Sequence, residues 1–216
     1  MKRNYFLIAG LMVVAVLIAT RIAYPHLPQR VPSHWNLHAQ VDDYSAKWTL
    51  FVTVPGIMVG LMLLFAALPW LSPRHFEVDS FRSTYLYIML VILGLMAYIQ
   101  AMMVWAGLDG RSSTDKALLG GICLMLALLG NVLGKVQRNF YIGIRTPWTL
   151  ANERVWYATH RFGAKTFVLG GLLAFVMVFA GAGFWFSFAT IMAAALTPVV
   201  YSLVHYKRLE RRGKVQ

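Results

Sequence analysis

The chain has 216 residues and a formal net charge of +12, and 59% of its residues are hydrophobic while only 13% are charged. Soluble domains average roughly 45–50% apolar and about 25% charged residues, and the apolar residues here form long runs, so an ordinary soluble domain is excluded. The positive charges lie mainly at the ends of these runs, where they orient a membrane protein, so they do not indicate direct nucleic-acid binding.

The first apolar run, residues 5–23, follows Lys2 and Arg3. Its length is close to the roughly 20 residues that a helix needs to cross a membrane. No small-residue cleavage site follows, so the run is predicted to be a retained span and not a signal peptide. The polar segment 24–47 comes next, and its three prolines argue against a continuous helix there.

Five further apolar runs are predicted to be spans, at residues 48–70, 83–108, 117–133, 166–181 and 184–204. The fourth span closes with Gly130 and Gly134, a spacing that lets two helices approach closely. Cys123 lies inside the same span and, as the single cysteine, can form no internal disulfide. The sequence therefore predicts an all-α polytopic membrane protein with six transmembrane helices.

The basic residues predict the orientation of these spans. With both termini in the cytoplasm, fifteen of the 20 Lys and Arg residues lie on inner segments and five on outer segments. The positive-inside rule therefore predicts cytoplasmic termini, an extracellular loop at 24–47 and a cytoplasmic loop at 134–165.

The predicted cytoplasmic loop is long, aromatic and cationic, with Lys135, Arg138, Arg145, Arg154, Arg161 and Lys165. A helix could begin at Pro147 or Leu150, behind Thr146 or Thr149 as the N-cap. From there Val155, Trp156, Thr159 and His160 fall on one helical face. The pattern predicts an amphipathic interfacial helix between the fourth and fifth spans.

Three hypotheses fit this loop. It lies against anionic membrane lipids, or it docks a cytoplasmic protein, or it binds an anionic headgroup at a helix N-terminus. The last hypothesis uses Asn139, Arg145, Thr146 and Trp148. Lipid contact is the simplest of the three.

The outer loop contains the sequence PSHWNLHAQVDDYSAKW. His34, His38 and Asp42 are four residues apart, so on a helix they would share a face and resemble metal ligands. The sequence lacks a fuller signature such as H-E-x-x-H, so a metal-dependent enzyme is the weaker hypothesis. The favoured alternative is a polar turn with Asp42 in turn hydrogen bonds and Trp35, Tyr44 and Trp48 anchored at the interface.

No sequence signature of catalysis is present. The chain has no G-x-S-x-G serine and no Walker or dinucleotide loop, so no catalytic residue and no cofactor is predicted. The span interiors hold no Asp, Glu or Lys, which argues against ion-coupled transport. A transporter or lipid-handling protein stays open, with Gln100, Asn131 and Arg145 contacting an amphiphile, provided that the spans enclose a cavity.

Two stretches resemble the SdpI-type family of bacterial immunity proteins. GNVLGKVQRNFYIGIRTPWTLANERVWYATHRFGAKTFVLGG is similar to the hallmark N…NxxIGIRTPWTL…VWxxTHR…G segment of that family. VPSHWNLHAQVDDYSAK resembles the P-x-H-W-N…D-x-Y…K loop of a domain of unknown function that precedes the segment in many members. The resemblance divides the chain into an N-terminal domain (1–70), a linking part (71–116) and an SdpI-like domain (117–216).

The resemblance implies a non-enzymatic protein of the bacterial plasma membrane. Such a protein protects against a secreted peptide toxin and, with toxin bound, holds a transcriptional repressor at the membrane. The expected extracellular toxin-binding residues are His34, Trp35, Asn36, Asp42 and Tyr44. The expected cytoplasmic residues for a partner or a lipid headgroup are Asn139, Arg145, Thr146, Trp148, Trp156 and His160.

Overall fold

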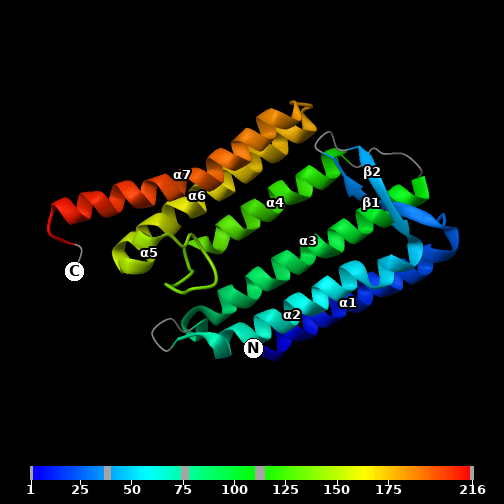
Figure 1. Cartoon of the computed structure of the whole chain (residues 1–216), viewed down its shortest axis with the longest axis horizontal. Helices are drawn as coiled ribbons and strands as arrows, with labels where there is room; N and C mark the ends of the chain where they lie inside the picture. Colours follow the sequence, from blue (N-terminus) through cyan, green and yellow to red (C-terminus); the bar gives the residue numbers. More distant parts are fainter. Residues whose placement is uncertain (1, 37–39, 74–77, 110–114, 215–216) are drawn as a thin grey trace. The chain divides into compact units, whose positions relative to one another are not determined.

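The computed structural model describes residues 2–36, 40–73, 78–109 and 115–214, and most of them are helical (Figure 1). Within these residues six helices are long and apolar enough to cross a membrane. They are α1 (Lys2–Ala23), α2 (Thr53–Leu71), α3 (Arg82–Asp109), α4 (Asp115–Leu133), α6 (Glu153–Phe179) and α7 (Phe184–Arg211). The predicted all-α polytopic fold with six spans is confirmed.

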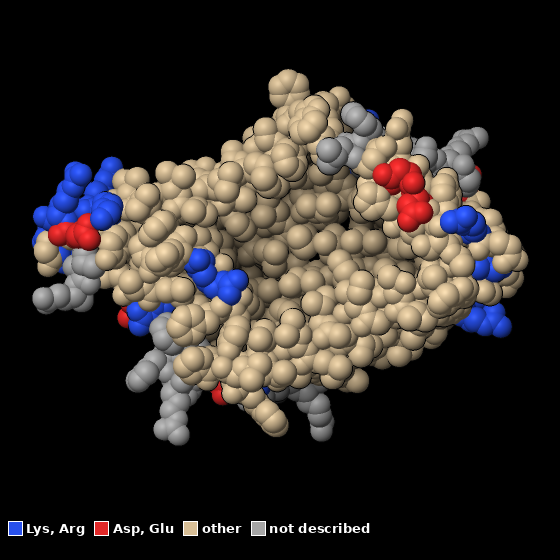
Figure 2. All heavy atoms as spheres, viewed as in Figure 1, with Lys and Arg blue, Asp and Glu red and all other residues tan. Residues whose placement is uncertain are grey.

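Charged side chains lie mainly toward the ends of these helices, although α6 also carries Arg161 and Lys165 in its first half. On the face drawn in Figure 2, Lys and Arg gather at the C-terminal end of α7 and near the hairpin described below, with a smaller group between them. Large apolar side chains are instead exposed along the shafts, among them Leu7, Leu63, Leu169 and Val200. Helices that bury only part of their apolar surface within the protein are suited to a lipid environment.

The chain forms two compact units, and the first comprises Met1–Phe65 and Met89–Ile122. Between α1 and α2 this unit carries an antiparallel hairpin of β1 (Arg30–Trp35) and β2 (Val41–Ala46). Two short 3-10 helices, η1 (Tyr24–His26) and η2 (Lys47–Phe51), connect the hairpin to α1 and α2. The sequence predicted only a polar turn here, because the prolines and the short, irregular strands hide the alternating pattern of a hairpin.

The hairpin packs on the C-terminal end of α3. A Cβ atom on Gly107 would lie 2.8 Å from Leu27 Cδ2 and 3.3 Å from Val31 Cγ1, so a larger residue here would push these two side chains aside. The base of the hairpin is held by Lys47, whose Nζ donates to the carbonyl oxygens of Tyr24 (3.4 Å) and Leu27 (3.2 Å). The same Nζ lies 4.5 Å from the centre of the Tyr24 ring, a cation–π contact.

The second unit comprises Ala66–Ile88 and Cys123–Gln216. It contains a 3-10 helix η4 (Val78–Phe81), the short helix α5 (Pro147–Ala151) and the pair α6 and α7. α6 begins at Glu153, well before residue 166 where the sequence placed the fifth span, because the Asn152 side chain caps it by accepting from Val155 N at 3.1 Å. The predicted amphipathic helix therefore consists of α5 and the first turns of α6.

Glycines allow α4 and α6 to lie in close contact within the second unit. A Cβ on Gly130 would lie 2.7 Å from Phe167 Cβ, and one on Gly171 would lie 2.7 Å from the carbonyl oxygen of Cys123. Beside Gly134 the nearest atoms are at an ordinary 3.8 Å. Gly130 therefore lets the two helices approach closely, as its spacing predicted. The second glycine in this close contact is Gly171 on α6, and not Gly134.

We predict that Gly171→Ala destabilises the protein by roughly 1–3 kcal/mol, because the added methyl group meets backbone atoms that cannot move aside. Gly60→Ala is the matched control, since nothing lies within 4 Å of its added Cβ. Thermal unfolding of the two purified variants checks the prediction. Equal melting temperatures would show that the helices separate without cost.

Candidate functional site

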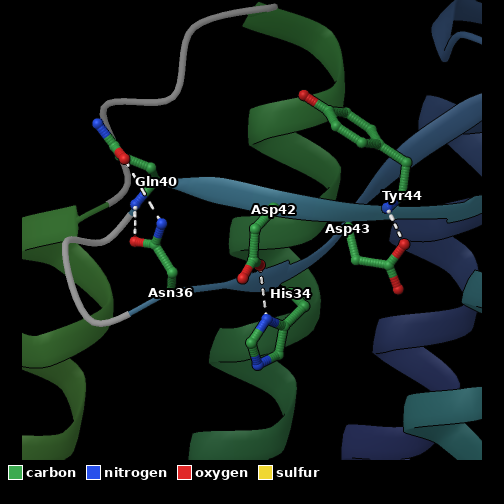
Figure 3. Close-up of polar contacts among 6 residues, drawn as sticks. All are labelled: His34, Asn36, Gln40, Asp42, Asp43 and Tyr44. Atoms are coloured by element: carbon green, nitrogen blue, oxygen red, sulfur yellow. Dashed lines mark hydrogen bonds and ion pairs between the residues drawn. The ribbon is translucent and has the colours of Figure 1, made fainter.

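The hairpin exposes a histidine–aspartate pair. His34 Nδ1 lies 2.6 Å from Asp42 Oδ1, and the two side chains are 66% and 42% exposed (Figure 3). They reach each other across the hairpin because register shifts in β1 on both sides of His34 move it out of regular pairing. An exposed pair of this kind contributes only about 0–1 kcal/mol to stability. Both groups are therefore free to exchange their partner for a ligand.

Neighbouring residues shape this surface. At the tip Asn36 N donates to Gln40 O (2.9 Å) and Gln40 N donates to Asn36 Oδ1 (3.1 Å), so Asn36 has a role in holding the turn. Tyr44 is 46% exposed on β2, while Trp35 is half-buried. Of the five predicted extracellular residues, His34, Asp42 and Tyr44 are thus the ones that face outward.

The metal hypothesis assumed a helix that aligned three ligands. His34 and Asp42 lie instead on two paired strands, and His38 lies outside the described residues. Among the residues that the structure describes, no three His, Cys, Asp or Glu side chains come close enough to hold a metal ion. The helical geometry on which the hypothesis depended is therefore wrong.

In the second unit, Asn139 organises the segment between α4 and α5. Its Oδ1 accepts from the N–H groups of Tyr141 and Ile142, both at 2.7 Å. Its Nδ2 donates to the carbonyl oxygens of Gln137 (2.8 Å) and Ile142 (3.0 Å). The side chain is fully buried and its donor and acceptor sites are all used. The Asn139 side chain therefore gives main-chain groups of residues 137–142 the hydrogen bonds that a helix would form within itself.

His160 and Trp156 of α6 hold the same segment. His160 Nε2 accepts from Ile144 N at 3.0 Å, so Nδ1 carries the proton and donates to Trp156 O at 2.8 Å. The two rings stack with centroids 4.0 Å apart, and Trp156 Nε1 donates to Val136 O at 2.8 Å. Gly143 has a φ of 111°, and a Cβ there would collide with His160 Nε2. Both predicted site residues are fully buried.

The helix start predicted at Thr146 and Pro147 is present. Thr146 is the N-cap of α5, and it forms a reciprocal capping box with Thr149, whose N donates to Thr146 Oγ1 at 3.2 Å. Trp148 Nε1 donates to Ser202 Oγ on α7. Since the first turn of α5 already has its cap, a headgroup would find no uncapped helix end there.

Arg145 is the one predicted cytoplasmic residue with an exposed side chain, and it donates to the carbonyl oxygen of Phe140. Lys135, Arg154, Arg161 and Lys165 of the same unit are also exposed. We call these five residues the cationic surface of the second unit. The remaining predicted residues, Asn139, Thr146, Trp148, Trp156 and His160, bond mainly within the protein.

Comparison with known proteins agrees with both stretches. Residues 135–202 match the model of the SdpI/YfhL protein family, and residues 11–59 match a domain of unknown function, DUF1648. The resemblance to the SdpI family is confirmed. The chain is also 28% identical over 207 residues to the protein named immunity protein SdpI of Bacillus subtilis (strain 168), covering 95% of each chain. No solved structure matches the chain.

The two matched regions contain the two sites. The SdpI/YfhL match begins at Lys135 and covers the segment held by Asn139, α5, α6 and much of α7. The DUF1648 match covers the hairpin. No sequence pattern predicted that Lys47, Gly143 and Ser202 would help to hold these two sites in place. The glycine between two isoleucines in IGI was the available signal for a left-handed backbone position.

We predict that Asn139→Leu destabilises the protein and exposes residues 135–146 to hydrogen exchange. The apolar side chain leaves buried N–H and C=O groups without partners, at a cost of roughly 1–3 kcal/mol for each unsatisfied group. Thermal unfolding and amide exchange measure the effect, and Lys135→Ala, an exposed neighbour, serves as the control. Unchanged exchange in Asn139→Leu would contradict the organising role of Asn139.

Proposed function

We propose that the chain is a multi-pass immunity protein of the bacterial plasma membrane, and not an enzyme, that protects its cell from a secreted antimicrobial peptide. The observation that carries the proposal is the similarity to the B. subtilis protein named an immunity protein, which extends over 95% of both chains. Because the similarity includes the hairpin as well as the SdpI-like segment, it supports the same two-part design: an N-terminal domain (1–70) and an SdpI-like domain (117–216), joined by residues 71–116.

The hairpin is the surface proposed to meet the peptide outside the cell. His34, Asp42 and Tyr44 offer an imidazole, a carboxylate and an exposed phenol ring on one small sheet. A carboxylate accepts hydrogen bonds from the Lys and Arg side chains common in membrane-active peptides. Since the His34–Asp42 pair is exposed, a peptide cation displaces the imidazole at little cost.

The cationic surface is proposed to serve the cytoplasmic side. Its five Lys and Arg side chains suit anionic lipid headgroups, each contributing about 1 kcal/mol near a membrane surface. The same surface is the proposed docking place for a cytoplasmic transcriptional regulator held at the membrane. In this proposal the buried Asn139, Trp156 and His160 fix the shape of the surface and make no contact with the partner.

The function is tested in a B. subtilis strain that lacks its own immunity protein. We expect expression of the chain to restore growth at the density where the empty-vector strain dies from its secreted peptide. Continued killing, with the protein detected in the membrane fraction, contradicts the proposal.

We predict that Asp42→Asn lowers this protection about tenfold, measured as the peptide dose that halves survival, because it removes one charge-assisted contact of roughly 1.5–3 kcal/mol. Glu210→Gln is the matched control, since Glu210 pairs with Lys207 on the exposed end of α7. Equal protection by the two variants at equal membrane abundance would remove the hairpin from the peptide-binding surface.

A further inference from the structure

The first unit contains a groove of about 400 Å³ between α1 and α3. Four alanines line it, Ala15 and Ala19 on α1 and Ala97 and Ala101 on α3, together with Met12 and Trp105. The lining residues extend over about 12 Å of α1 and about 16 Å of α3 at 1.5 Å per residue. That length is close to one leaflet of a hydrocarbon core roughly 30 Å thick. The groove is therefore suited in length to one apolar chain.

Gln100 is the polar residue with an unused atom at this groove. It is 2% exposed, and its Nε2 donates to Leu50 O at 2.8 Å and to Thr20 Oγ1 at 3.0 Å. A carbonyl can only accept, so this contact fixes which end of the amide is nitrogen. Gln100 Oε1 is buried and has no hydrogen-bond partner within the described parts of the chain. An unsatisfied acceptor of this kind costs about 1–3 kcal/mol, which a donor on a bound molecule would recover.

At the level of Gln100 the lining of α1 ends at Thr20, whereas the lining of α3 continues to Leu108. Thr20, the partner of Gln100, lies in the last turn of α1, and Leu50 lies in η2 just before α2. These helix ends mark the level where a membrane amphiphile carries its polar group. From that level the groove continues in one direction past Ala19, Ala97 and Ala15 to Met12, and in the other past Val104 and Trp105 to Leu108.

We propose that this groove binds a single-chain membrane amphiphile with a hydroxyl group beside its acyl chain, as in a monoacylglycerol. The hydroxyl donates to Gln100 Oε1, and the acyl chain lies along the four alanines. A volume of about 400 Å³ falls within the roughly 300–1,000 Å³ range of small-molecule sites. A peptide helix is about 10–12 Å wide and already uses its main-chain donors, so it fits the groove and the free acceptor less well.

A tryptophan introduced at Met12, at the end of the groove toward which the acyl chain runs, provides the reporter for a test. The full chain in phosphatidylcholine nanodiscs is titrated with the 9,10-dibromostearoyl ester of glycerol, whose bromines quench tryptophan fluorescence. The contribution of this tryptophan is the difference between Met12→Trp and the native chain. We expect this contribution to saturate at one ester per chain, and the methyl ester, which has no hydroxyl, to bind about fivefold more weakly for the loss of one hydrogen bond.

A pair of variants locates the site. Ala101→Phe fills the groove and should weaken binding at least tenfold, whereas Ala67→Phe, at an exposed position of α2 outside the groove, should leave it unchanged. Both alanines are exposed, and equal melting temperatures confirm that folding is intact. Quenching that never saturates, or that Ala101→Phe leaves unchanged, overturns the proposal, as does equal binding of the two esters. Quenching by a brominated apolar peptide, and not by the glycerol ester, would make the groove a peptide site.

Discussion

Hydrocarbon offers no hydrogen bonds, so every main-chain N–H and C=O group within a membrane must find its partner inside the protein. Six long helices meet this constraint by themselves. Outside them, buried main-chain groups also need partners, and side chains supply some of these. In the first unit Lys47 bonds to the carbonyls of Tyr24 and Leu27, and Gln100 bonds to Leu50 O. In the second unit Asn139, Trp156 and His160 do the same for residues 136–144. Lys47, Asn139, Trp156 and His160 all lie in the two stretches that resemble the SdpI-type family.

Residues that bond to the main chain in this way are not available to bind a partner. A polar or aromatic residue in a family motif invites a binding role, yet Asn139 and His160 are fully buried and their hydrogen-bonding atoms are occupied. The residues left to contact a partner are the less distinctive ones beside them, such as Arg145 and Arg154, which are exposed. On the hairpin the reverse holds, because His34 and Asp42 bond mainly to each other and remain accessible.

The sequence predicted what depends on hydrophobicity and on local rules. The six spans followed from run length, and the α5 start followed from Thr146 and Pro147. The hairpin was missed because the prolines of residues 24–47 and the register shifts of the strands hide the alternating pattern of paired strands. The early start of α6 was missed because Arg154 and Arg161 break the apolar run without breaking the helix. Burial of Asn139 could not be predicted either, since polarity alone does not distinguish a ligand contact from a main-chain contact.

Both proposed roles require the hairpin and the cationic surface to face opposite sides of one membrane. The three helices between them in the chain, α2, α3 and α4, are predicted to cross the membrane once each. Single cysteines at Tyr44 and Arg154, introduced after replacing the buried Cys123 with alanine, test this directly with a membrane-impermeant maleimide. We expect Tyr44→Cys to be labelled in intact cells and Arg154→Cys to be labelled only after the membrane is opened. Labelling of both cysteines in intact cells, or of neither, would contradict this topology.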